Sequence, residues 1–138
     1  MRLLAAREHS TLELRQKLAK KGADDQILDA LLEQLQQDRY LSDQRYAEVF
    51  VRQKAAAGKG PFVISQLLQS KGISRSDADL AMEEAECDWY ELATDVYRKK
   101  FKTPIADQKD RAKRMRFLMS RGFSGDIISS VMETSWDE

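Results

Sequence analysis

The pentapeptide LQSKG at residues 68–72 decides the fold, because related pentapeptides stand fifty residues before it and fifty residues after it. These copies are LAKKG at 18–22 and LMSRG at 118–122. Each copy ends on a basic residue followed by glycine, a sequence typical of a helix C-terminus. The cation suits the negative helix end, and the glycine adopts the left-handed conformation that closes the helix. A regular period of this length indicates a protein built from helical repeats.

Each pentapeptide is followed by the start signals of a second helix. A residue able to cap a helix stands two positions after every glycine: Asp24, Ser74 and Ser124. Apolar residues then mostly keep register at 28/78/128, 31/81/131 and 32/82/132, whereas 27/77/127 breaks the pattern. Capping boxes at 10/13, 74/77 and 88/91, and Pro61 after Gly60, mark further helix starts. Each repeat therefore ends one helix and begins another.

A third helix per repeat is expected at about 42–57 and 88–101, with apolar stripes through Tyr46 and Val49 or Phe50 in one copy and Leu92 and Val96 in the other. The predicted fold is all-α, with about eight helices in tandem three-helix, helix-turn-helix-like repeats that stack into an elongated, curved array. The predicted repeats are residues 1–57, 58–102 and 103–138, the last with two helices only.

The composition excludes several classes of protein. The chain has 138 residues, 42% of them hydrophobic, which is enough for a core. No stretch approaches 18 apolar residues and the charged first residues do not resemble a signal peptide, so we expect a cytoplasmic protein without a membrane partner. A single His9 and a single Cys87 exclude an internal disulfide and a Cys/His zinc site. Both are interpreted as structural residues, and no metal or other cofactor is expected.

The net charge of zero hides two opposite blocks. Residues 76–95 carry eight acids and no base, whereas residues 97–116 carry nine bases and two acids. The acidic block is interpreted as a solvated face, with repulsion or binding of a partner as the alternative. The basic block is interpreted as a surface for phosphates or for an acidic protein, and the alternative is a solvated face that balances the acids. Neutral net charge argues against a protein that simply coats DNA.

The basic block supplies the candidate binding residues. On a helix, Lys109, Lys113 and Arg116 fall within about a 60° arc, while an apolar stripe on another side is expected at Ala112, Met115 and Met119. The full candidate set for contact with phosphates or an acidic partner is Arg98, Lys99, Lys100, Lys102, Lys109, Arg111, Lys113, Arg114, Arg116 and Phe117.

Core packing is the expected role of the aromatic residues Tyr40, Tyr46, Phe50, Trp89, Tyr90, Tyr97 and Phe101. Phe117 lies beside the basic arc, and two interpretations of its side chain are open. It stacks on a base or anchors a partner, or it packs on a neighbouring unit. The segment GKG at 58–60 lacks the spacing of a phosphate-binding loop and follows a helix, so nucleotide binding is not expected there. No catalytic constellation is found, and the chain is not expected to be an enzyme.

Taken together, several motifs resemble the RecX family of regulators of the bacterial RecA recombinase. They are SxxELRxKL at 10–18, RYLSDxRYA at 39–47, GKGP at 58–61, LxxKGI at 68–73, Trp89 and Ala93, RKKF at 98–101, and KxxxFLxxRGF at 113–123. The resemblance covers most of the chain, which departs from the usual pattern by beginning close to the first repeat and by its short third repeat.

The resemblance implies a regulator without enzymatic activity that binds the RecA nucleoprotein filament in its helical groove. Such a protein dampens strand exchange, ATP hydrolysis and the coprotease role of the filament in the SOS response. The resemblance also implies that the protein contacts single-stranded or double-stranded DNA weakly or through the filament. The protein is expected to be a monomer. Two alternatives stay open, a direct DNA-binding helical module and a helical scaffold for another protein.

Overall fold

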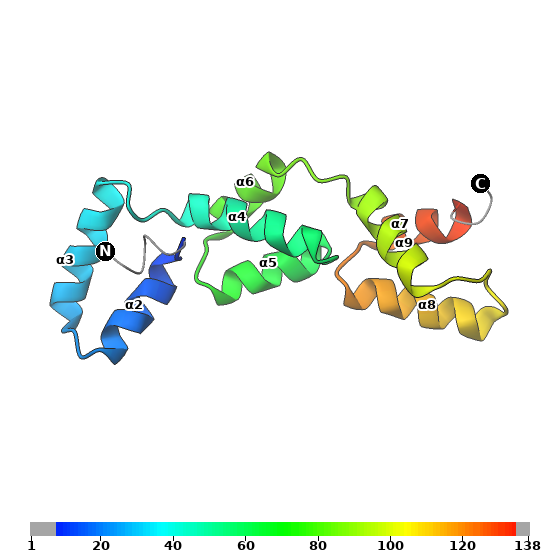
Figure 1. Ribbon diagram of the computed structural model, residues 1–138, viewed down its shortest axis with the longest axis horizontal. Helices are drawn as coiled ribbons and strands as arrows, with labels where there is room; N and C mark the ends of the chain where they lie inside the picture. The colour runs from blue at the N-terminus through cyan, green and yellow to red at the C-terminus, as the bar shows by residue number, and fades with distance from the viewer. Residues whose placement is uncertain (1–7, 135–138) are drawn as a thin grey trace. The chain divides into compact units, whose positions relative to one another are not determined.

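The computed structural model describes residues 8–134, and within that range the chain contains eight α-helices and no strand (Figure 1). This confirms the all-α expectation. The helices are α2 Thr11–Lys20, α3 Asp25–Gln37, α4 Asp43–Ala56, α5 Pro61–Ser70, α6 Arg75–Glu84, α7 Trp89–Lys100, α8 Gln108–Ser120 and α9 Gly125–Thr134.

The repeated pentapeptides end their helices as predicted. Gly22, Gly72 and Gly122 have φ angles of 90°, 78° and 99°. The N–H of the residue after each glycine donates back to the carbonyl of the leucine five residues earlier: Ala23 to Leu18 at 3.3 Å, Ile73 to Leu68 at 3.1 Å and Phe123 to Leu118 at 3.3 Å. This is the Schellman pattern, which satisfies carbonyls that the end of a helix leaves without partners.

The predicted helix starts are confirmed as well. Ser10 and Glu13 form a reciprocal capping box at α2. The side chains of Asp24, Ser74 and Ser124 accept backbone N–H groups at the starts of α3, α6 and α9. Asp88 caps α7, and Pro61 is the first residue of α5. Local signals therefore place the helix ends before any tertiary contact is considered.

The chain divides into two compact units. The first comprises residues 8–51 and Leu67–Ala85, and the second comprises Arg52–Gln66 and residues 86–134, so α4 and α5 contribute to both. In the first unit α2 and α3 pack as a helix hairpin (Figure 1). Leucines build the core of this hairpin: Leu14, Leu32, Leu35 and Leu41, with Leu18 and Leu31 against them.

In the second unit α9 packs against both α7 and α8 (Figure 1). The core between these helices contains Ala93, Tyr97, Phe101, Leu118, Phe123, Ile128, Val131 and Met132. Four of these residues, Leu118, Ile128, Val131 and Met132, stand at positions that the fifty-residue repeat marks as apolar. The repeat boundaries predicted after residues 57 and 102 stay predictions.

The start of α5 lies directly against the end of α8, and we call this contact the α5–α8 seam (Gly60 and Phe62 with Arg121 and Gly122). The N–H of Gly60 donates to the carbonyl of Arg121 at 2.6 Å, and the N–H of Phe62 donates to that of Gly122 at 3.0 Å. Carbonyl groups at the end of α8 thus accept hydrogen bonds from N–H groups at the start of α5, which have no partner within their own helix. A Cβ atom on Gly60 would lie 2.5 Å from the carbonyl carbon of Gly122, so the seam requires glycine.

Three apolar residues are exposed, although their spacing predicted that they would be buried. Met119 is 62% exposed because the buried face of α8 passes through Leu118, one residue away. Tyr40 is 63% exposed because α3 has already ended and Leu41 turns inward in its place. Tyr90 is exposed because the inner face of α7 passes through Ala93 and Tyr97. The core assignment of these residues was wrong.

None of the helices in the described range is long and apolar enough to cross a membrane.

Candidate partner-binding surface

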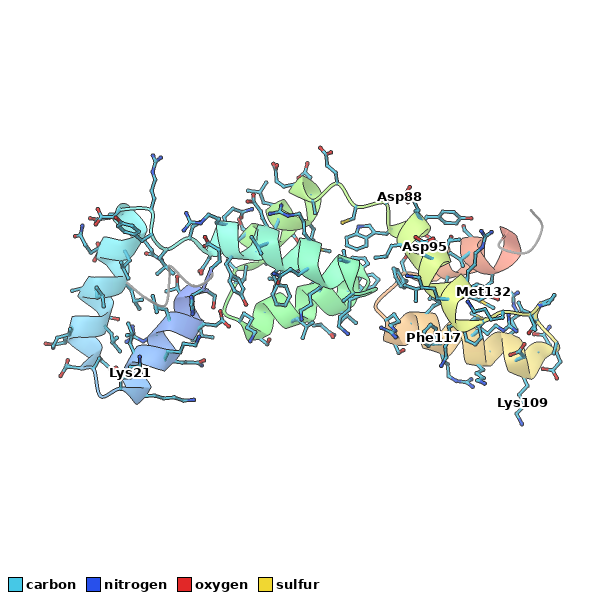
Figure 2. All side chains as sticks on the ribbon, in the orientation of Figure 1. Lys21, Asp88, Asp95, Lys109, Phe117 and Met132 are labelled. Atoms are coloured by element: carbon cyan, nitrogen blue, oxygen red, sulfur yellow. The ribbon has the colours of Figure 1, made fainter. Side chains whose placement is uncertain are left out.

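Every residue of the predicted basic set lies in the second unit. Arg98, Lys99 and Lys100 form the exposed last turn of α7, and Lys102 is exposed in the loop that follows. The remaining members lie on α8: Lys109, Arg111, Lys113, Arg114, Arg116 and Phe117. Lys109 projects outward near one end of α8, and Phe117 lies towards the other end (Figure 2). The set therefore does not form one patch.

One part of the set lines a shallow groove along α8, which we call the Lys113 groove. Its walls are Lys109, Lys113 and Arg116 together with Asp107 and Asp110, and its volume is about 290 Å³. The three bases share a face, as their spacing predicted. The two carboxylates leave the groove with a net charge of only about +1.

Both carboxylates are engaged in building the start of α8. Asp107 caps the helix by accepting the N–H of Asp110 at 2.8 Å. Asp110 accepts the N–H of Ala106 at 3.0 Å and pairs with Arg114 at 2.9 Å. The backbone N–H of Ala106, and then Arg114, lower the pKa of the Asp110 carboxyl, because both stabilise its ionised form. Asp110 therefore stays ionised near neutral pH.

Arg114 lies inside the protein, and its placement on the binding surface was wrong. Only 3% of this residue is exposed. Its guanidinium donates to the hydroxyl of Tyr97 at 2.9 Å, to the carbonyls of Thr103 and Pro104 at 2.9 and 3.3 Å, and to Asp110. It also lies 4.7 Å from the centre of the Phe101 ring. A planar cation with five donors suits this site, where it fastens the loop before α8 to α7.

A larger groove runs between the end of α4 and helices α7 and α8, and we call it the α7–α8 groove. Its volume is about 420 Å³. Ala56, Ala57 and Gly58 line it from the end of α4, Leu92, Asp95, Val96, Lys99 and Lys100 from α7, and Phe117 and Arg121 from the end of α8. Three cations and one carboxylate thus line the groove together with apolar side chains.

Phe117 packs within its own unit and also faces this groove. Its ring meets that of Phe101 edge to face, with centres 5.5 Å apart. The Lys100 ammonium and the Arg121 guanidinium lie 5.7 and 5.3 Å from the centre of the Phe117 ring. Both distances are within the range of cation–π attraction. Phe117 therefore helps to hold two cations at the groove.

Arg121 is a groove residue that the sequence did not reveal. Its place before Gly122 in the repeated pentapeptide explained it as a helix-end cation. A possible signal was that it lies four residues after Phe117, a spacing that brings side chains together on a helix. Arg98, Lys102 and Arg111 line neither groove.

All three backbone N–H groups of the GKG segment donate hydrogen bonds to backbone carbonyls. The N–H of Gly58 donates to Ala55 at 2.9 Å, that of Lys59 to Lys54 at 3.0 Å and that of Gly60 to Arg121 at 2.6 Å. These donors are already used and do not form a phosphate cradle.

Neither His9 nor Cys87 is among the residues that line the two grooves. His9 is 1% exposed, beside the Ser10 cap, and its Nε2 is 3.0 Å from Lys17 Nζ. Cys87 is half-buried, and this burial raises the pKa of its thiol. The structural interpretation of His9 is confirmed by its burial.

Three family profiles match the chain. They describe the first, second and third three-helix domains of RecX, and they match residues 1–35, 42–82 and 86–132. The second match contains α4 to α6 up to residue 82, and the third contains α7, α8 and most of α9.

Similar proteins carry the same family name. The chain is 44% identical over 133 residues to the regulatory protein RecX of Pseudomonas fluorescens (strain Pf-5), covering 96% of this chain and 86% of that protein. It is 39% identical over 133 residues to the RecX protein of Ectopseudomonas mendocina, covering 96% and 89%. The crystal structure of RecX from Lactobacillus salivarius shares the fold with a TM-score of 0.86, at 24% identity, over 97% of this chain and 90% of that one. The chain therefore belongs to the RecX family of regulatory proteins.

Proposed function

We propose that this protein binds the RecA nucleoprotein filament and inhibits strand exchange, ATP hydrolysis and coprotease activity. Membership of the RecX family supports the proposal. The observation that carries it in this chain is the exposed basic surface of the second unit, where Lys109, Lys113 and Arg116 share one groove. These residues contact DNA phosphates or an acidic surface of RecA, and the protein acts without catalysing a reaction.

Inhibition of this kind requires only unequal affinity for two states of the filament. A protein that binds the inactive state more tightly shifts the filament towards that state. Basic side chains raise the rate of encounter with a negatively charged filament, and salt weakens this effect. Inhibition is therefore expected to require more protein at higher salt.

The test is RecA-dependent ATP hydrolysis on single-stranded DNA, titrated with this protein at two salt concentrations. The triple variant Lys109→Glu/Lys113→Glu/Arg116→Glu is expected to inhibit more weakly. The control Lys20→Glu/Lys21→Glu/Arg75→Glu makes the same change in net charge on exposed residues of the first unit. No inhibition by the wild-type protein at stoichiometric levels would refute the function. Unchanged inhibition by the first variant would refute the assignment of its three residues.

Direct DNA binding is a second candidate, favoured by the excess of bases in residues 97–116. In that case the protein binds free DNA tightly without RecA, and its affinity falls steeply with salt. Weak binding to free DNA together with strong inhibition of RecA would reject this candidate. Capture of another protein without RecA would instead favour a scaffold.

A further inference from the structure

The α7–α8 groove is lined by both apolar and cationic side chains. Ala56, Ala57, Leu92 and Val96 supply apolar atoms, and Lys99, Lys100 and Arg121 supply positive charge. One carboxylate, Asp95, lies among the lining residues, so the groove carries a net charge of about +2. This mixture suits a ligand that carries both an apolar group and negative charge.

Two of the cations are positioned before any ligand arrives. Phe117 is fixed edge to face on buried Phe101, and Lys100 and Arg121 lie over its ring. Cation–π attraction restricts these long side chains, so binding costs less side-chain entropy than it would for freely moving cations. Arg121 can also bind a carboxylate through two parallel hydrogen bonds.

The lining favours a peptide over a nucleic acid. A base could stack on Phe117 only by displacing the cations from its ring, and a row of phosphates would meet the charge of Asp95. A peptide avoids both costs, since it can place an apolar side chain inside, carboxylates at the cations and an N–H or a cationic group at Asp95.

We propose that the α7–α8 groove binds an acidic peptide segment of the partner protein, with one apolar side chain inside the groove. Carboxylates of the segment pair with Lys99, Lys100 and Arg121. This inference rests on the proposed function and deepens it, because it assigns the groove to the protein component of the filament.

A photochemical crosslink tests what occupies the groove. Ala57 is small and exposed and lines the groove, so the full-length Ala57→p-benzoylphenylalanine variant carries the probe there. Ala106 is exposed in the same unit and lines neither groove, so the same substitution at Ala106 is the control. Each variant is mixed with RecA assembled on oligo(dT), sedimented to measure binding, and irradiated. Mass spectrometry then identifies the adducts.

The proposal expects the Ala57 probe, and not the Ala106 probe, to crosslink to a peptide rich in Asp and Glu. A crosslink to DNA would overturn it in favour of a nucleic-acid ligand. Co-sedimentation without a crosslink at Ala57 would also overturn it, while leaving the proposed function intact. A lack of co-sedimentation by both variants would overturn this proposal and the proposed function together, so the two failures are distinguishable.

A charge variant gives a second, independent readout. Lys100→Gln/Arg121→Gln is expected to weaken filament binding by roughly ten- to hundredfold, because two charge-assisted hydrogen bonds are lost. Arg52→Gln, on an exposed residue of the same unit outside both grooves, should change binding less than about twofold. Binding of the double variant to free oligo(dT) should stay within about twofold of wild type. An equal loss on filament and on free DNA would overturn the proposal.

Discussion

Replacement of Gly122 with alanine is expected to reduce the free energy of unfolding by about 1–5 kcal/mol, because two costs coincide at this residue. Its φ of +99° lies in the left-handed region, and a Cβ there would stand 2.6 Å from the backbone nitrogen of Val63. The left-handed conformation costs an L-residue about 1–2 kcal/mol. Alanine also lowers the conformational entropy of the unfolded chain relative to glycine, and this offsets about 0.4–1 kcal/mol of that cost. The crowding adds about 1–3 kcal/mol.

Three further alanine variants separate the two costs. Gly60→Ala brings a Cβ within 2.5 Å of Gly122 without a positive φ, so crowding alone should cost about 1–3 kcal/mol. Gly22 has a φ of +90° with nothing near its Cβ position, so backbone strain alone should cost about 1 kcal/mol. Gly125 has neither feature and begins α9, so alanine there should be neutral or stabilising by up to about 1 kcal/mol.

Urea unfolding followed by far-ultraviolet circular dichroism measures these differences. Amide hydrogen exchange at Gly60 and Phe62 locates them, since both N–H groups should exchange faster once the seam opens. The Gly60→Ala/Gly122→Ala double variant should cost less than the sum of the single variants, because both methyl groups break one contact. If Gly60→Ala and Gly122→Ala were no more destabilising than Gly125→Ala and Gly22→Ala respectively, the close approach of α5 and α8 would be refuted.

Three other substitutions and measurements test the interior. Arg114→Met should lower the free energy of unfolding, measured in urea, by about 2–4 kcal/mol, because Tyr97, Thr103 and Asp110 lose their partner. Its control, Arg116→Met on the surface, should change this free energy by less than about 0.5 kcal/mol. Asp110 has a lowered pKa, so the stability that its ionised carboxylate contributes is complete above about pH 4 and is lost as the pH falls through its folded-state pKa. In thermal melts at acid pH, the melting temperature of Asp110→Asn should therefore depend less on pH than that of the wild type. The raised pKa of Cys87 should place half-maximal iodoacetamide alkylation above about pH 8.5, and a lower midpoint would contradict its burial.

The helix ends were predictable because their physics is local. A left-handed glycine, a Schellman hydrogen bond and an N-cap each involve residues within about six positions, so the sequence alone specifies them. Gly72 and Ser74 illustrate this, since each does in the structure what its residue type predicts. The fifty-residue period then fixes the order of the helices.

The orientation of α8 was not predictable in the same way. Helical periodicity gives relative angles but does not say which face is buried when charged residues cover most of the helix. The face that packs includes Arg114, because Tyr97 and two loop carbonyls satisfy its donors. A rule that places charge outside therefore fails here, and Met119 is exposed as a result.

The three copies of the helix-ending motif share a backbone but have separate roles, because different neighbours surround them. Beside Gly22 the Cβ position is open, beside Gly72 it meets Leu12, and beside Gly122 it meets the backbone of α5. The basic residues diverge in parallel: Lys21 is exposed, Lys71 pairs with Glu13 at 3.6 Å, and Arg121 lies over Phe117 in the α7–α8 groove. A repeat thus supplies one stable turn with a cation beside it, and the packing of each copy decides whether that cation faces water, a carboxylate of another helix or an open groove.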